Sequence, residues 1–155
     1  MKTHTKNEDV AVKKWIAPCG LNCYTCSGNK HGIIAKNAKI MQKYMNGFSS
    51  FAPFLADFNP IYKDYTNFDA ILNDLAAPNC EGCQSGNPLN QECGIFRCPK
   101  LEKQGTCATC DEFPCQLGGA DESFLKTWKT HIMNIREQGL VAHWKSTKSR
   151  GHFDK

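Results

Sequence analysis

Ten cysteines at short, repeated spacings are the residues of this chain that can do chemistry. A thiolate binds zinc or iron tightly, and two thiolates separated by two residues can hold one ion from a single tight turn. The spacing therefore predicts metal binding by cysteine. All ten are candidate ligands: Cys19, Cys23, Cys26, Cys80, Cys83, Cys93, Cys98, Cys107, Cys110 and Cys115.

Cys80 and Cys83 form the clearest of these pairs, a Cys-x2-Cys knuckle in which Gly82 allows the turn to tighten. Cys93 and Cys98 follow after nine intervening residues. A loop of that length closes at modest entropic cost. These four sulfurs are the local pairing, which we favour as a tetrahedral zinc site because its loop is short.

A ribbon pairing stays open beside the local one. Here the knuckle of Cys80 and Cys83 shares an ion with Cys107 and Cys110, which lie 23 residues further on. That is the spacing of a zinc ribbon. If the local pairing holds, Cys107 and Cys110 need partners from the opening cluster, and two of the ten thiols remain without an assignment. The opening cluster consists of Cys19, Cys23 and Cys26.

The opening cluster also allows an iron–sulfur interpretation. Its Cys-x3-Cys-x2-Cys spacing matches the signature of radical S-adenosylmethionine enzymes, but no alternation of strands and helices follows Cys26. An iron–sulfur cluster with Cys107 or Cys115 as the fourth ligand is the more tenable form of this alternative. A further option is that His31, five residues beyond Cys26, completes a site of three cysteines and one histidine.

The charge of the chain gives weak support for nucleic-acid binding. Nineteen Lys and Arg against fifteen Asp and Glu give a formal net charge of +4. Two divalent ions held by eight thiolates would bring that charge to zero, because ligating thiols lose their protons. The chain shows no apolar run of membrane-spanning length and no secretion signal, so we expect a cytoplasmic protein in which disulfides are uncommon.

Helical periodicity surrounds the cysteines and must position them. One helix is expected over residues 32–46, a short one between Pro53 and Pro60, and a third that begins at an Asn67 cap and ends before Pro78. A final helix is expected to begin at Asp121 or Ser123 and to end at Gly139. Residues 79–119 are rich in glycine and proline and hold seven of the ten cysteines, so we expect an irregular, metal-organised loop.

The fold class predicted from these patterns is mainly α, with helices around an irregular, metal-organised cysteine-rich loop; a small α+β arrangement is the alternative. We expect residues 1–14 to be a flexible N-terminus and residues 15–145 to form a single cysteine-rich domain. Residues 146–155 are expected to be a basic, flexible tail.

Several motifs together resemble the cysteine-rich family called domain of unknown function 3795, whose members are small prokaryotic proteins. The resemblance runs from about Ala17 to Trp144. It implies a single, metal-binding domain and brings no known activity with it. The motifs are Cys19-Gly-Leu-Asn-Cys23-x2-Cys26, Cys80-x-Gly82-Cys83, Ile95-x-Arg97-Cys98, Cys107-x2-Cys110-Asp-Glu-Phe-Pro-Cys115 and Arg136-x2-Gly139.

From the sequence we expect a zinc-binding protein with structural metal that presents a surface to a protein partner. An iron–sulfur or thiol redox protein and a nucleic-acid-binding zinc module are the alternatives. No glycine-rich phosphate loop, serine-centred elbow or pair of carboxylates is visible, so the sequence leans against an enzyme without deciding the question. We expect no membrane association and no nucleic-acid partner.

Overall fold

The fold is mainly helical, as predicted. A computed structural model describes residues 6–116 and 121–152. In these two ranges the chain forms seven α-helices and three 3-10 helices, and no β-strand. The α-helices are α1 (Lys6–Lys13), α2 (Ile33–Tyr44), α3 (Phe48–Ala56), α4 (Tyr65–Ala76), α5 (Leu101–Gln104), α6 (Glu122–Gln138) and α7 (Leu140–Thr147); the 3-10 helices are η1 (Pro60–Asp64), η2 (Cys83–Ser85) and η3 (Cys107–Thr109).

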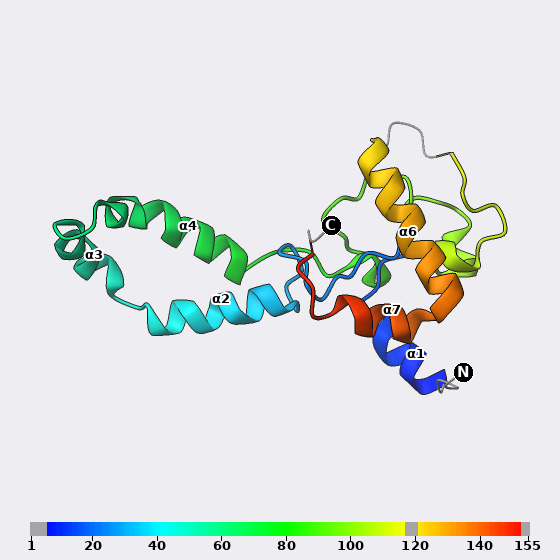
Figure 1. Cartoon of the computed structure of the whole chain (residues 1–155), viewed down its shortest axis with the longest axis horizontal. Coiled ribbons are helices and arrows are strands. Elements are labelled where there is room, and N and C mark those ends of the chain that lie inside the picture. Colours follow the sequence, from blue (N-terminus) through cyan, green and yellow to red (C-terminus); the bar gives the residue numbers. More distant parts are fainter. Residues whose placement is uncertain (1–5, 117–120, 153–155) are drawn as a thin grey trace.

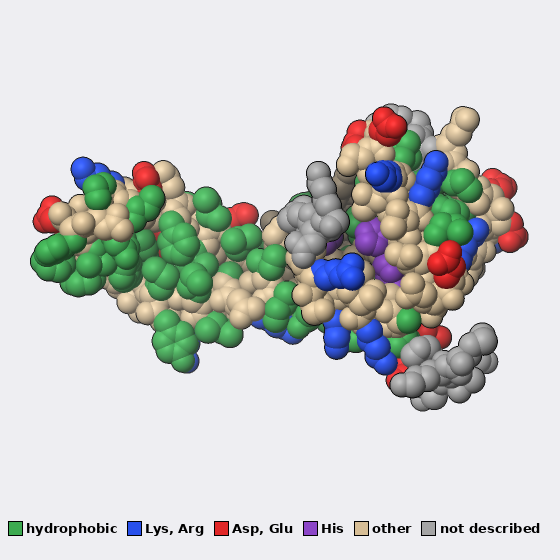
Figure 2. Space-filling view, in the orientation of Figure 1, with side chains coloured by type: hydrophobic (Ala, Val, Ile, Leu, Met, Phe, Trp, Pro, Cys, Tyr) green, Lys and Arg blue, Asp and Glu red, His purple; other side chains and the backbone are tan. Residues whose placement is uncertain are grey.

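A helical hairpin projects from the rest of the molecule (Figure 1). Helices α2 and α4 pack against each other as its two arms, and α3 with η1 forms its tip. Its interior is small, because the buried residues between the arms are Ala38, Leu72 and Ala76. Hydrophobic side chains are conspicuous over the tip and along the arms (Figure 2). The expected helix over residues 32–46 is confirmed.

The cysteines lie in the second lobe, which contains the main hydrophobic core. The side chains of Ile16, Trp128 and Ile132 are almost fully buried at its centre. Helices α6 and α7 pack against each other, and α1 packs against α7. These helices flank the irregular segment that follows α4, in which the described elements are only three or four residues long. The predicted irregular loop is confirmed up to residue 116, and residues 117–119 lie outside the described residues.

The final helix was predicted well. Helix α6 is capped by Asp121, whose carboxylate accepts a hydrogen bond from the backbone N–H of Phe124 over 2.9 Å. The helix ends at Gly139, and the chain then continues directly into α7. That second helix returns Val141 to the core, where 2% of its surface remains exposed.

Two local expectations were wrong, and both termini predicted to be flexible contain ordered contacts. Residues 6–13 of the N-terminus form α1, in which Val12 is buried. Asp64, not Asn67, precedes the first residue of α4. Helix α3 begins ahead of Pro53, whose missing N–H is tolerated on an exposed surface. In the predicted flexible tail, His152 is held by a contact of 2.9 Å between its Nδ1 and the carbonyl oxygen of Asn22.

None of the helices in the described parts of the chain is both long enough and apolar enough to cross a bilayer.

Candidate metal centre

All ten cysteines are free thiols in the lobe that α1, α6 and α7 surround. They come from both sides of the hairpin, three before it and seven after it. Because the arms of the hairpin run in opposite directions, the chain returns after α4 to the place where it left before α2 (Figure 1). The hairpin therefore brings cysteines together that are far apart in sequence.

Backbone hydrogen bonds join the segments before and after the hairpin. The N–H of Cys80 donates to the carbonyl oxygen of Gly28 over 3.1 Å, and the N–H of Lys30 donates to the carbonyl oxygen of Cys80 over 3.0 Å. These two bonds form a short parallel bridge between Asn29 and Cys80. A Cβ added to Gly28 would lie 3.8 Å from the sulfur of Cys26 and 3.9 Å from the Cβ of Cys80, so glycine leaves the space between these two side chains open.

Six thiols from both sides of the hairpin interact with one another electrostatically. Burial is the main cause that raises the pKa of Cys83 to about 11, and the charges of Cys80, Cys93 and Cys26 raise it further. Burial also raises the pKa of Cys19, and the charges of Cys83, Cys23 and Cys93 raise it further. We call this set the six-cysteine group: Cys19, Cys23, Cys26, Cys80, Cys83 and Cys93.

The sulfur of Cys80 is a hydrogen-bond acceptor for the backbone. It accepts hydrogen bonds from the backbone N–H groups of Gly82 and Leu89, each over 3.3 Å. Backbone donors stabilise a thiolate, and hydrogen bonds to ligand sulfurs tune a bound metal. The turn that Gly82 allows, at a φ of 94°, thus orients a donor toward the first sulfur of the knuckle.

The most buried thiols of this group are neutral at physiological pH when no metal is bound. Burial raises the pKa of Cys19 to about 12, and a hydrogen bond from the backbone of Leu21 partly offsets the effect. Burial also raises the pKa of Cys23 to about 12, helped by the charges of Cys83, Cys26 and Cys80. A cation placed among these sulfurs would reverse the effect, because it stabilises the thiolates that burial disfavours.

Four further thiols line a single cavity of about 300 Å³. The cavity lies between the irregular segment and α6, and the side chains of Phe113 and Trp128 form part of its apolar wall. We call its thiols the four-cysteine group: Cys98, Cys107, Cys110 and Cys115.

The pKa of Cys107 is affected by the other three thiols of this group. Burial raises the pKa of Cys107 to about 11, and the charges of Cys115, Cys110 and Cys98 act in the same direction. The indole N–H of Trp128 acts in the opposite direction. This N–H is buried and has no hydrogen-bond partner of regular geometry, but it lies near enough to Cys107 to lower the pKa of that thiol.

Long-range contacts hold the four-cysteine group in place. The N–H of Cys107 donates to the carbonyl oxygen of Pro18 over 3.0 Å, which joins this group to the opening cluster. From α6, Arg136 donates to the carbonyl oxygens of Ala108 and Cys110 over 3.0 and 2.6 Å. At the mouth of the cavity, Lys100 forms an ion pair with Glu112.

This division differs from both pairings considered from the sequence. The local pairing places Cys98 with Cys80, Cys83 and Cys93, whereas the structure places Cys98 in the cavity with Cys107. The ribbon pairing joins Cys83 to Cys107, and these two thiols lie in different groups. Within residues 6–116 and 121–152, no three His, Cys, Asp or Glu side chains converge closely enough to hold a metal ion.

Two other residues named from the sequence form hydrogen bonds with groups other than sulfur, although Arg97 lines the cavity of the four-cysteine group. His31 is exposed, and its backbone N–H donates to the Oδ1 atom of Asn29. Arg97 donates from Nε to the carbonyl oxygen of Gln91 over 2.9 Å and pairs with Glu92. The contact between Trp128 and Cys107 was not predicted, because cysteine spacing carries no signal of it.

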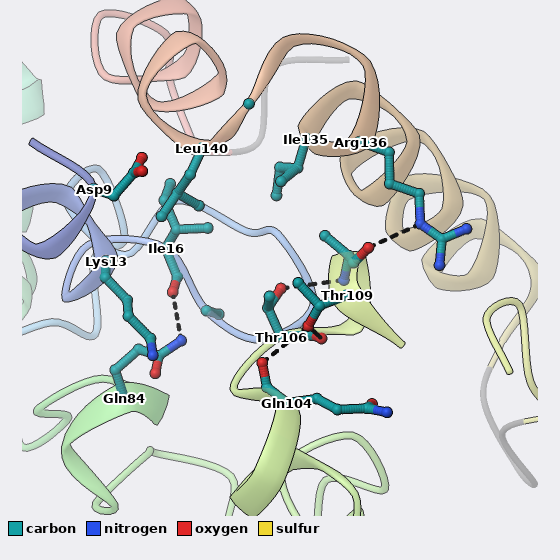
Figure 3. A pocket seen from close by; sticks show the side chains of 13 residues that line it. Asp9, Lys13, Ile16, Gln84, Gln104, Thr106, Thr109, Ile135, Arg136 and Leu140 are labelled. Atoms are coloured by element: carbon teal, nitrogen blue, oxygen red, sulfur yellow. Dashed lines mark hydrogen bonds between the residues drawn. The ribbon is translucent and has the colours of Figure 1, made fainter. Parts of the chain in front are cut away.

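A larger cavity, of about 570 Å³, lies beside the four-cysteine group (Figure 3). Gln84 lines it and donates to the carbonyl oxygen of Ile16 over 3.2 Å, while Arg136 lines its edge from α6. The buried Oε1 atom of Gln104 has no hydrogen-bond partner there. The walls of this cavity therefore connect α1, η2, η3 and α6 around the sulfur-bearing segments.

Residues 15–118 match the model of one protein family, described as a protein of unknown function (DUF3795). The chain belongs to this family. The matched region covers both cysteine groups and the hairpin, and stops before α6. No curated protein and no solved structure shows significant similarity to the chain.

Proposed function

We propose that this DUF3795 protein is a zinc-binding protein whose metal sites are structural, and that it acts as a protein-interaction module. The observation that carries the metal part of the proposal is the four-cysteine group, in which four thiols line one cavity. A structural zinc ion takes four protein ligands and leaves no open position, and four thiolates are a preferred ligand set.

The six-cysteine group supplies the second site. A tetrahedral ion takes four of its six thiols, so the two thiols without an assignment belong to this group. Cys80 is the strongest candidate ligand, since two backbone N–H groups already stabilise its sulfur. Zinc binding draws the sulfurs of each group toward a common centre and releases their protons.

A structural role for the metal is supported by the composition of the region. Between α4 and α6 the described elements are three or four residues long, so the segment lacks the repeating hydrogen bonds of a long helix. It buries Ile95 and Phe113 in the core, and metal cross-links would stabilise the irregular backbone between them. Two zinc sites would provide them, and the site in the six-cysteine group would join residues before and after the hairpin.

The interaction part of the proposal is supported by the hairpin. Large apolar side chains such as Phe54 and Phe58 are 54% and 75% exposed there. Contiguous exposed apolar surface marks interaction sites in folded proteins. The hairpin is attached to the lobe that holds the thiols, so metal loss would affect how it is anchored.

Removal of zinc from the full-length protein tests the structural role. Trp15, Trp128 and Trp144 all lie outside the hairpin, and therefore report on the cysteine-rich lobe. We expect a strong chelator under reducing conditions to change their fluorescence and to abolish amide protection from 79 to 116, while α2 and α4 keep helical circular dichroism. Unchanged fluorescence and protection in protein shown to be free of metal would contradict the proposal.

Cys110→Ser provides a second test, with Thr109→Ser as its matched control. The first substitution removes a ligand of the four-cysteine group, and the second changes an exposed neighbour. We expect Cys110→Ser alone to lose zinc and to lower the melting temperature. An equal loss of zinc in both variants would contradict a ligand role for Cys110.

A further inference from the structure

The exposed apolar surface of the molecule is concentrated on the hairpin. In the described residues, nine of the twelve exposed large hydrophobic side chains fall between residues 40 and 71. They include Phe51 at 50%, Phe54 at 54% and Ile71 at 61% exposure. Figure 2 shows hydrophobic side chains over the tip and arms of the hairpin, while charged side chains are more numerous on the other lobe.

The aromatic part of this surface is continuous. Rings lie in contact from Phe58 through Phe54, Phe51 and Phe48 to Tyr65, with centroid distances between 5.0 and 6.2 Å. The run therefore extends from the end of α3 across to α4. We call the exposed apolar side chains between residues 40 and 71 the hairpin apolar face.

The hairpin lacks the second layer that two packed helices need. The buried cluster between its arms consists of Ala38, Leu72 and Ala76, with Met45 and Leu75 packed against it. Helices bury their apolar stripes against another packed layer, and the four-helix bundle is one regular way to do so. Two hairpins supply the four helices of such a bundle.

The size of the face fits a partner of this kind. Aromatic side chains carry roughly 150–250 Å² each, so the nine exposed side chains present on the order of 1,000 Å² per chain. A stable protein interface takes about 800 Å² from each partner. The hairpin apolar face alone is therefore large enough for a specific dimer.

The charges of the two arms are complementary. Helix α2 carries Lys36, Lys39 and Lys43 and no acidic residue. Helix α4 carries Asp69 and Asp74 and no basic residue. A twofold axis that places α2 of one chain against α4 of the other brings opposite charges together at both contacts, because a twofold interface repeats each contact twice.

We propose that the hairpin apolar face binds the same face of a second copy of this chain, forming a four-helix bundle with α2 packed against the partner's α4. This inference rests on the interaction part of the proposed function and not on its metal part. It names a second copy of the protein as the partner.

The oligomeric state of the full-length, metal-loaded protein tests this inference. Sedimentation equilibrium should give about twice the chain mass of 17.3 kDa. Phe54→Glu combined with Ile71→Glu should weaken self-association at least tenfold, because it buries charges in the bundle. The matched control, Val10→Glu with Met133→Glu, changes two exposed apolar residues outside the hairpin and should leave the dimer intact.

Reversal of the charges tests the arrangement of the helices. Lys39→Glu with Lys43→Glu should weaken the dimer several-fold at low salt, and the further changes Asp69→Lys and Asp74→Lys should restore it. A dimer insensitive to the first reversal would overturn the packing of α2 against α4.

The same experiments would show whether something other than a second copy of the chain binds the hairpin apolar face. A monomeric wild-type protein, or a dimer that survives Phe54→Glu with Ile71→Glu, overturns the inference. Binding of the monomer to neutral lipid vesicles would replace the second copy by a membrane surface. Zinc content is measured on every sample, so that failure of the dimer and failure of the metal sites are distinguished.

Discussion

Arg136 donates a hydrogen bond of 2.6 Å from its guanidinium to the backbone carbonyl oxygen of Cys110. A second bond reaches the carbonyl oxygen of Ala108, and the guanidinium stacks 4.9 Å from the centre of the Phe113 ring. The long helix α6 thus holds the turn that presents Cys107 and Cys110 to the cavity, although it contributes no sulfur itself.

Loss of this contact should loosen the four-cysteine group. We expect Arg136→Ala to lower the free energy of unfolding by about 1–2 kcal/mol, since two hydrogen bonds from a charged donor are removed at an exposed site. It should also speed zinc release to a chelator. Urea titration and chelator kinetics are the measurements, and Lys129→Ala, an exposed change on the same helix, is the control. Equal effects of both variants would contradict this role of Arg136.

The grouping of the thiols predicts which cysteine substitutions are additive. Cys98→Ser and Cys110→Ser remove ligands of one group, so the double variant should lose no more zinc than either single variant. Cys98→Ser with Cys83→Ser should lose zinc from both groups. Metal analysis of the full-length variants checks this. The opposite pattern, in which Cys98 and Cys83 behave as one site, would restore the local pairing.

This grouping could not be predicted from the sequence, because there the entropic cost of closing a loop can be judged only from the number of residues in it. Cys26 and Cys80 are separated by 53 residues, which suggests a costly closure. The antiparallel helices α2 and α4 remove most of that cost, since rigid arms bring the chain back to its starting point. The periodicity that predicted α2 would therefore have predicted that Cys26 and Cys80 meet, but only if α2 and α4 were known to pack against each other.

Other features were predictable to different degrees. The cap at Asp121 follows from local chemistry, in which a carboxylate accepts a free N–H of the first turn. Helix α1 was missed because its buried contact depends on the packing of Val12 against a distant part of the chain. The role of Trp128 beside Cys107 is likewise a tertiary contact, and no local pattern indicates it.

Acid should destabilise the protein through His131. Burial, and then the charges of His143 and His152, lower its pKa from 6.5 to about 4. Between pH 6.5 and 4 this histidine is therefore protonated in the unfolded chain but not in the folded chain. The free energy of unfolding falls as the pH falls through this window. The loss attributable to this ring should be on the order of 1–2 kcal/mol, less than the full shift implies, because the ring is partly exposed.

The comparison of wild-type protein with His131→Gln isolates this effect. Both proteins lose thiolate–metal bonds in acid, so the difference between their unfolding free energies is the informative quantity. That difference should shrink or change sign as the pH falls from 7 to 4.5, because the variant has one ionisable group fewer. A difference independent of pH would contradict the assignment.

Gly20 should not tolerate a side chain. Its φ is 85°, and a Cβ there would lie 2.7 Å from the Cβ of His131. Gly86 has a similar φ of 81°, but no atom lies within 4 Å of an added Cβ. Both Gly→Ala variants should lose about 1–3 kcal/mol to backbone strain. Gly20→Ala should lose more, because α6 must also move; equal losses in thermal unfolding would contradict the close packing.

The central claim is that the thiols hold structural zinc, and the metal content of the protein purified without oxygen tests it most directly. Zinc, iron and acid-labile sulfide are measured on the same full-length sample. The account predicts colourless protein with about two zinc ions per chain, one for each cysteine group, and no sulfide. A brown preparation with iron and sulfide in cluster proportions would contradict it and favour the iron–sulfur alternative.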